Sequence, residues 1–107
     1  ATWCGPCKTG IERIKPLKEE LKNEDIVFVY ITNNTSPEKD YKKAIPNIKG
    51  EHFKVSADEW NYLTQKFNIY GIPHYALLDK NGKVVNAHMM PLENKKLKKV
   101  LMEQVNK

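Results

Sequence analysis

The chain has two cysteines, and their spacing is the first indication of chemistry in it. They lie three positions apart in the run Trp3-Cys4-Gly5-Pro6-Cys7. In the first turn of a helix this spacing brings the two sulfurs close enough to bond, and proline fits there because first-turn N–H groups have no helical partner. The run therefore predicts a disulfide at the start of a helix that can form and break.

Cys4 is expected at the helix N-terminus, where orphan N–H groups and the positive end of the helix dipole favour a thiolate. If its pKa falls from about 8.5 to about 7, the thiolate fraction at neutral pH rises from roughly 3% to roughly half. We expect Cys7, one turn further and facing the body of the protein, to be the resolving thiol.

A pair of cysteines at this spacing can also be half of a zinc site. Such a site needs four ligands, and the chain has no second pair. The three histidines, His52, His74 and His88, are scattered without the short spacing of zinc ligands. A metal site and an inert buried cysteine pair are therefore minority alternatives, and we expect neither a metal nor a cofactor.

The length of 107 residues and a 40% hydrophobic composition predict one domain with one core, spanning residues 1–107. No apolar run approaches the roughly 18 residues that cross a bilayer, and nothing at the N-terminus resembles a signal peptide. Because Ala1 lies so close to the cysteine motif, we expect the chain to be part of something longer, with any targeting segment upstream.

The net charge of +5 comes almost entirely from lysine, since Arg13 is the one arginine. The lysines are interleaved with glutamates, and the arginine that favours phosphate and guanine contacts is nearly absent. This pattern argues against a nucleic-acid partner and favours a solvated surface. A weak preference for acidic protein partners is the minority interpretation.

Periodicity predicts the elements of the first half of the chain. An amphipathic helix is expected from the cysteines to about Asn23, with a kink at Pro16. The unbroken apolar run 26–31 predicts a strand that is buried on both faces. The apolar stripe of the helix is formed by Ile11, Ile14, Leu17 and Leu21.

The middle of the chain carries helix start signals. Ser36 is predicted to cap a short helix that runs through Ala44 and ends at Pro46. Residues 47–55 are hard to assign, although 52–55 can be a short extended piece. Ser56 and Glu59 have the spacing of a capping box, and they open a helix whose core face is predicted to hold Trp60, Leu63 and Phe67.

A hairpin and a helix are predicted for the last third. Residues 75–79 and 83–87 are expected to be strands that pair antiparallel across the Asn81-Gly82 turn. A final helix is predicted from the stripe Leu97, Val100, Leu101 and Val105. The order of elements predicts an α/β fold in which helices flank both faces of a mixed sheet.

Three segments together resemble the thioredoxin superfamily. They are the cysteine motif with the Lys8 that follows it, Gly71-Ile72-Pro73, and the run 79–84, Asp-Lys-Asn-Gly-Lys-Val. The additional helical segment between 36 and 55 is more similar to bacterial thiol-disulfide oxidoreductases of the TlpA/ResA type than to small cytosolic thioredoxin. The resemblance covers essentially the whole chain.

The resemblance implies roles for the residues that match the motifs. Cys4 would attack a substrate disulfide and Cys7 would resolve the mixed disulfide. Trp3 would flank the pair on the substrate-binding surface, with Gly5 and Pro6 between the cysteines.

A second part of that surface is implied at the Gly-Ile-Pro segment. Pro73 matches the family's cis-proline, which faces the cysteines and leaves the backbone of Ile72 free to bond an extended substrate. His74 stands where the family often has threonine. It either biases the thiolate pKa and the reduction potential, or is a strand residue with a satisfied imidazole.

The sequence departs from the family pattern in three places. The position that usually carries the kinking proline is Glu12, and the proline is Pro16 instead. Gly10 stands where some ResA-type members have a glutamate near the active site. The family's strand before the cysteine motif, which lies in the middle of its sheet, is missing together with the elements before it. Its absence predicts unpaired backbone groups on the strands beside the gap.

The function that the resemblance implies is thiol–disulfide exchange with partner proteins. The partners would be protein thiols and disulfides together with an upstream thiol reductant, and reduction of the partner is the favoured direction. The insertion favours an extracytoplasmic or periplasmic location over a cytoplasmic one. A noncatalytic thioredoxin-like module that binds extended peptides is the alternative.

Overall fold

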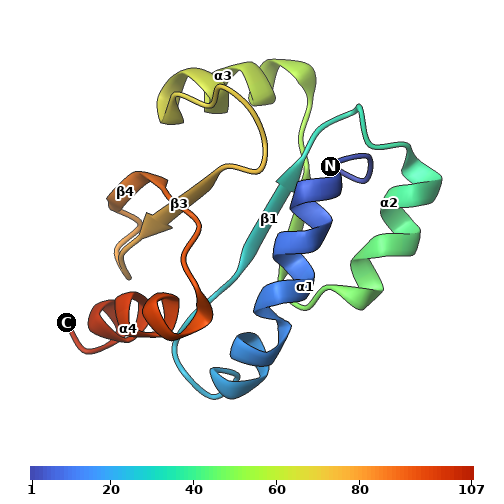
Figure 1. Cartoon of the computed structure of the whole chain (residues 1–107). Coiled ribbons are helices and arrows are strands. Elements are labelled where there is room, and N and C mark those ends of the chain that lie inside the picture. The colour runs from blue at the N-terminus through green and yellow to red at the C-terminus, as the bar shows by residue number, and fades with distance from the viewer.

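The computed structural model describes all residues from 1 to 107. Helices and strands are interspersed along the chain (Figure 1). Their bounds are α1 Gly5–Glu20, β1 Val29–Thr32, α2 Glu38–Ala44, the 3₁₀ turn η1 Ile45–Asn47, β2 Glu51–Lys54, α3 Ala57–Phe67, β3 Tyr75–Leu78, β4 Val84–Met89 and α4 Asn94–Val105. None of the helices combines the length and the apolar character that a membrane crossing requires.

The strands form two small sheets. Strand β1 pairs in parallel with β2, from Val29 opposite Glu51 to Thr32 opposite Lys54. Strand β3 pairs antiparallel with β4, and no strand joins the two pairs. Parallel and antiparallel pairings therefore coexist, as the predicted mixed sheet requires. One edge of β1 and one edge of β3 have no strand partner, as the missing central strand of the family predicts.

The predicted strand at 26–31 is the clearest error of the sequence reasoning about the fold. Strand β1 begins at Val29, and Val29 and Ile31 are 54% and 43% exposed. Only the alternate residues Tyr30 and Thr32 are half-buried, so one face of the strand is covered and the other is open. The apolar residues before the strand, Ile26 and Phe28, pack against the helices instead.

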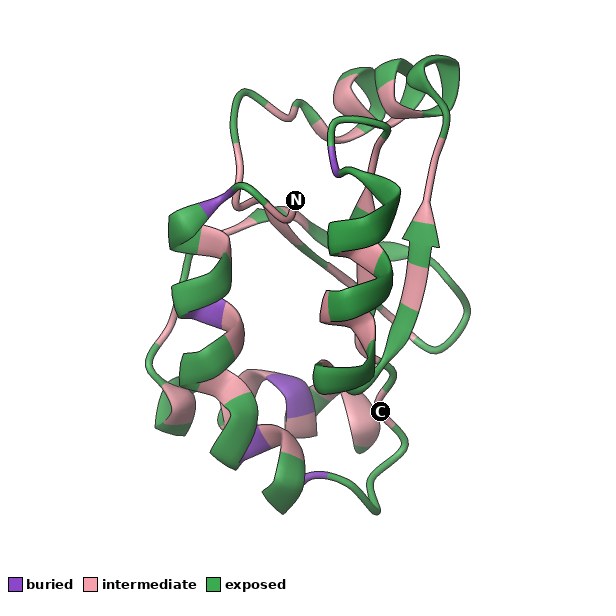
Figure 2. Cartoon of the chain, turned by 90° about the vertical axis from the view of Figure 1, so that its right-hand side faces the viewer, coloured by how far each residue is buried: buried purple, intermediate pink, exposed green.

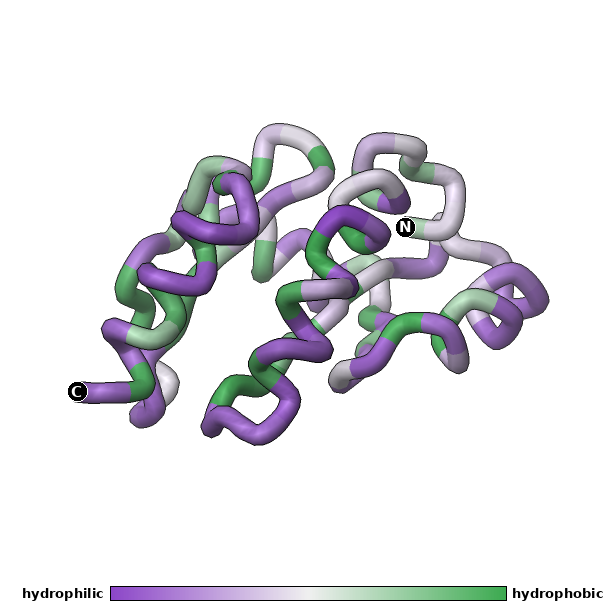
Figure 3. Tube along the Cα trace, turned by 60° about the horizontal axis from the view of Figure 1, so that its bottom comes forward, coloured by the Kyte–Doolittle hydropathy of each residue, from purple (hydrophilic) through white to green (hydrophobic).

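The core is small and lies between α1 and α4. Leu17 and Leu21 of the α1 segment and Leu101 of α4 are buried together. Buried positions are few and most of the chain is half-buried or exposed (Figure 2). Hydrophilic and hydrophobic residues alternate along the helices (Figure 3), as the predicted stripes require. The partly buried side chains around this cluster are Ile26, Phe28, Leu77, Leu97 and Met102.

Helix α1 is shorter than predicted and contains Pro16 in its interior. It ends at Glu20 and not near Asn23, because the N–H of Lys22 turns back to the carbonyl of Glu19, at 3.4 Å. A bond to the residue three positions back closes the last turn and stops the helix.

Helix α2 starts without the predicted serine cap. Its N-cap position is Pro37, which makes no side-chain cap bond. The Ser36 hydroxyl is occupied by partners elsewhere in the fold, which are described with the site. Pro46 lies in the 3₁₀ turn that follows α2, so the α-helix does end before it as predicted.

The other local signals are confirmed. Ser56 and Glu59 form a complete capping box at α3, although Trp60, Leu63 and Phe67 are half-buried and not fully enclosed. In the β3–β4 hairpin the Asp79 carboxylate accepts the N–H groups of Asn81 and Lys83, each at 2.9 Å. Gly82 has a φ of 80°, a conformation that glycine adopts at low cost. Helices α3 and α4 lie on opposite sides of this hairpin (Figure 1).

Candidate functional site

The two cysteines are joined by a disulfide at the start of α1. Their Cα atoms are 5.2 Å apart, and Cys4 is the N-cap residue of the helix. The backbone N–H of Cys7 points at the Cys4 sulfur, with a nitrogen to sulfur distance of 3.2 Å. The predicted pairing and its position are confirmed. A donor aimed at the sulfur from a helix N-terminus is the arrangement that stabilises a thiolate.

The two cysteines differ in burial. Cys4 is 3% exposed, whereas Cys7 is only half-buried. The segment before the helix encloses Cys4, because it folds back in a turn in which the Cys4 N–H donates to the carbonyl of Ala1, at 3.1 Å. Cys4 is therefore the more enclosed cysteine of the oxidised form, and the expectation that Cys7 faces the body of the protein stays a prediction.

A small polar network holds the residues that precede the cysteines. The N–H of Thr2 donates to the Ser36 hydroxyl at 3.1 Å, and that hydroxyl lies 2.7 Å from the Thr32 hydroxyl. Ser36 is completely buried. The indole N–H of Trp3 donates to the Thr35 hydroxyl at 2.9 Å, while its ring stays 61% exposed. The loop after β1 thus fixes an exposed aromatic ring beside the disulfide.

Sequence reasoning did not find this network. The one available signal was the concentration of hydroxyl side chains at 32–36 directly after a strand, in a segment that was predicted only as a polar loop and helix cap. Thr2, which donates to the Ser36 hydroxyl, is 34 residues away along the chain, so no local pattern could identify this partner.

The Gly-Ile-Pro segment leads into β3. The Ile72–Pro73 peptide bond is cis, as the resemblance implies. The Nε2 of His74 donates to the carbonyl of Ala87 at 2.7 Å, and its ring lies edge-on to His88 with 4.5 Å between centroids. The His74 ring is therefore hydrogen-bonded within the β3–β4 hairpin, as expected if His74 is a structural residue of the strand. Ile72 and Pro73 are half-buried.

Tyr75, two residues after Pro73, brings the start of β3 against α1. Gly10 of α1 is buried, and a Cβ built on it would lie 2.7 Å from the hydroxyl oxygen of Tyr75. The phenol therefore occupies the space that a side chain at position 10 would need. This contact links the proline segment to the helix that carries the cysteines, and the one sequence signal for it is a glycine inside a predicted helix.

A second phenol lies close to Tyr75. The Tyr30 hydroxyl accepts a hydrogen bond from the Lys18 ammonium at 2.7 Å. Burial, with a smaller contribution from Tyr75, raises the pKa of Tyr30 to about 12. Burial also lowers the pKa of Lys18, and the positive charges of Lys15 and Lys49 lower it further. The Lys18 ammonium lies 4.7 Å from the centre of the Tyr30 ring and also binds the carbonyl of Lys49.

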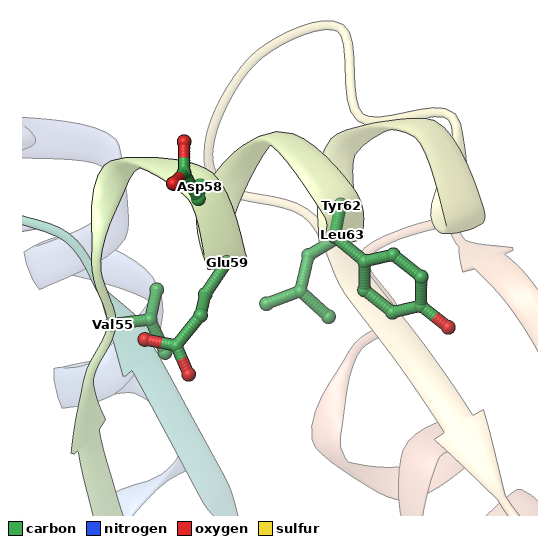
Figure 4. A pocket seen from close by; sticks show the side chains of 5 residues that line it. All are labelled: Val55, Asp58, Glu59, Tyr62 and Leu63. Carbon is green, nitrogen blue, oxygen red and sulfur yellow. The ribbon is translucent and has the colours of Figure 1, made fainter.

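The hollow under α3 is separate from these groups. It has a volume of about 370 Å³ and is lined by Val55, Asp58, Glu59, Tyr62 and Leu63. Figure 4 shows Asp58 pointing away from the other four side chains. Neither cysteine lines it, and no cluster of three or more His, Cys, Asp or Glu side chains is arranged to hold a metal ion.

Comparison with known proteins places this geometry in a family. The model of the Redoxin family matches residues 1–101. A crystal structure of a Bacteroides vulgatus protein named as a thiol-disulfide oxidoreductase is 25% identical, with a TM-score of 0.73 over 97% of this chain and 72% of that one. A solution structure of a protein with the same name and organism is 26% identical, with a TM-score of 0.71 over 98% and 66%.

A plant protein is also similar over part of its length. "Probable nucleoredoxin 1" of Arabidopsis thaliana is 28% identical over 89 residues, which are 80% of this chain. The chain spans only 15% of the length of that curated relative. Together with the cysteine pair at the start of α1, these matches assign the fold and the general chemistry: the chain belongs to the Redoxin family, within the thioredoxin superfamily.

Proposed function

We propose that this chain is a thiol-disulfide oxidoreductase that reduces disulfides of partner proteins. The observation that carries the proposal is the Cys4–Cys7 disulfide at a helix N-terminus, with the Cys7 N–H 3.2 Å from the Cys4 sulfur. The family and the solved relatives support thiol–disulfide chemistry in general. The direction, the order of attack and the partners are our proposal.

The proposed cycle begins with both cysteines reduced. The Cys4 thiolate attacks one sulfur of the partner's disulfide, forming a mixed disulfide and releasing the partner's other sulfur as a thiolate. The Cys7 thiolate then attacks the Cys4 sulfur, which restores the Cys4–Cys7 disulfide and releases the second partner thiolate. The partner gains two electrons and the chain loses two, so an upstream thiol reductant must return the pair to the dithiol. The structure corresponds to the oxidised end of this cycle.

Two observations favour different attacking sulfurs. The helix terminus lowers the cost of a negative charge on Cys4, whereas Cys7 is the more accessible residue in the oxidised form. We assign the attack to Cys4, because thiolate character governs reactivity and reduction frees the sulfur from its partner. We also propose that Trp3, Ile72, Pro73 and His74, with Gly5 and Pro6 of the motif, form the surface that holds the substrate.

The attacking sulfur can be assigned by trapping. Cys7→Ser should accumulate a mixed disulfide with a reporter disulfide protein, because the intermediate on Cys4 cannot be resolved. Cys4→Ser should not accumulate one, and neither variant should reduce insulin disulfides catalytically. Trapping on Cys4→Ser alone would reverse the assignment. If Cys4→Ser leaves the rate of insulin reduction by a thiol reductant unchanged, the chain does not catalyse that reduction, and the noncatalytic peptide-binding module replaces the enzyme.

The location is a separate part of the proposal. We infer an extracytoplasmic or periplasmic site of action from the resemblance of the segment between 36 and 55 to the TlpA/ResA type. Fractionation of cells that produce the natural protein tests it, and recovery with the cytoplasmic fraction would favour the cytoplasmic alternative.

A further inference from the structure

The Tyr75 side chain lies on the face of β3 that meets α1. Tyr75 and Leu77 alternate with exposed residues along the strand, and Leu77 packs against the cluster that contains Leu17 of α1. Two residues earlier on the same face, the Tyr75 hydroxyl lies at the position that a Cβ on Gly10 would occupy, two helical turns before Leu17. The two contacts together fix how β3 lies against the helix, and they carry the phenol toward the end of α1 that holds the cysteines.

The position of Gly10 relative to Cys7 gives this contact a chemical meaning. Residues three apart in a helix are neighbours on its surface, with their Cβ atoms about 5–6 Å apart. The Tyr75 hydroxyl is 2.7 Å from the Cβ site of Gly10, so it lies one turn from the Cys7 side chain on the same face of α1. Since position 10 has no side chain, nothing from that residue stands between the hydroxyl and the sulfur.

The Tyr75 hydroxyl is a hydrogen-bond donor that is not used in the oxidised structure. The neighbouring Tyr30 hydroxyl is held by the Lys18 ammonium at 2.7 Å, whereas no hydrogen bond of the structure involves the hydroxyl of Tyr75. Disulfide sulfurs are weak acceptors, while a thiolate is charged and accepts a much stronger bond. Reduction of the Cys4–Cys7 bond therefore creates an acceptor beside a free donor.

We propose that Tyr75 is a positioning residue of the redox pair, whose phenol hydroxyl donates a hydrogen bond to the Cys7 sulfur when the disulfide is reduced. The inference rests on the proposed function, because it concerns the same pair of cysteines. Reduction adds two electrons and up to two protons to the disulfide, and Tyr75 gains or loses neither. Its hydroxyl lowers the free energy of the thiolate form, so it raises the reduction potential and lowers the Cys7 pKa.

The test compares Tyr75→Phe with the unsubstituted protein. The midpoint potential is measured by equilibration with glutathione redox buffers, and the Cys7 pKa by thiolate absorbance at 240 nm. Loss of the donor should change the equilibrium constant with glutathione about tenfold toward the disulfide, which is about 30 mV for a two-electron couple. The Cys7 pKa should rise. Tyr62→Phe removes the same atom from a 63% exposed tyrosine of α3, and it should change neither quantity.

A second variant keeps the inference testable if Tyr75→Phe folds poorly. Gly10→Ala places a methyl group 2.7 Å from the Tyr75 hydroxyl, so the phenol must move away. The variant should shift the potential in the same direction, and it should add nothing in the Tyr75→Phe background. Equal potentials for Tyr75→Phe and Tyr62→Phe would overturn the inference.

The same measurements separate this inference from the proposed function. If Cys4→Ser and Cys7→Ser abolish insulin reduction while Tyr75→Phe leaves the potential unchanged, the oxidoreductase stands and the role of Tyr75 is wrong. If even excess dithiothreitol, a stronger reductant than glutathione, cannot reduce the pair, the proposed function itself fails.

Discussion

The contact between Gly10 and Tyr75 makes a quantitative prediction for stability. Gly10→Ala has two opposing effects. Alanine in a helix interior is more favourable than glycine by about 0.8–1.0 kcal/mol. Against this, the new methyl group would lie 2.7 Å from the Tyr75 hydroxyl, and overpacking of this kind costs about 1–3 kcal/mol. We expect Gly10→Ala to leave the stability unchanged or to lower it by up to about 2 kcal/mol.

Tyr75→Phe should reverse the sign of the effect at position 10. The next atom of the tyrosine ring is 3.9 Å from the Cβ site, which is an ordinary contact distance. With the hydroxyl removed, the helix propensity of alanine is therefore unopposed, and Gly10→Ala should stabilise the protein by about 1 kcal/mol. The two substitutions should be coupled by about 1–3 kcal/mol, the cost of the contact between an alanine methyl group at position 10 and the Tyr75 hydroxyl.

The assay is urea denaturation followed by circular dichroism at 222 nm, with the disulfide intact in all four proteins of the cycle. Gly5→Ala is the matched control, because a Cβ there meets no atom within 4 Å, and its effect should be the same with Tyr75 or Phe at position 75. An effect of Gly10→Ala that agrees in both backgrounds to within about 0.3–0.5 kcal/mol would refute the reasoning, since that is the range of independent sites.

Three further predictions concern the polar groups. Ser36→Ala should lower the free energy of unfolding by about 1–3 kcal/mol, because it leaves the Thr2 N–H and the Thr32 hydroxyl without their buried partner, and thermal or urea unfolding against the exposed control Thr9→Ala measures it. Ser56→Ala should cost about 1 kcal/mol by removing the α3 cap, and Ser56→Asp, which can still cap, should recover most of it. The contribution of Tyr30 to stability should be constant below pH 10 and should fall between pH 10 and 12, because the unfolded chain releases the Tyr30 proton at its ordinary pKa while the folded chain holds it to about 12. Tyr30→Phe should make this fall shallower in alkaline denaturation, and an unchanged slope would contradict the assignment.

Several features could be predicted because their causes lie within a few residues. The disulfide, the capping box and the Asp79–Lys83 turn each depend on a spacing of three or four positions. Periodicity predicted the order of helices and strands except for β2, whose segment was hard to assign. The resemblance to the superfamily came from the cysteine motif, the Gly-Ile-Pro segment and the run 79–84. Such short-range interactions form in nearly any fold that contains the same few residues, so the local sequence is enough to predict them.

The errors share one physical cause, which is that burial depends on distant parts of the chain. The run 26–31 is apolar enough for a strand covered on both faces, but β1 has one strand neighbour and Val29 is 54% exposed. Ser36 has the type and position of a helix cap, but its hydroxyl bonds to residues on two other segments. The enclosure of Cys4 depends on how residues 1–3 fold against the loop after β1.

The sequence by itself determined that the two sulfurs meet at the N-terminus of a helix, because a spacing of three residues in the first helical turn is enough to bring them together. Only the tertiary structure decided which of them is enclosed, which loop holds Trp3, and which phenol lies beside the glycine one turn beyond Cys7. Those contacts join residues more than 30 positions apart, and their partners are selected by the packing of β1 and β3 against α1 and not by any pattern along the chain.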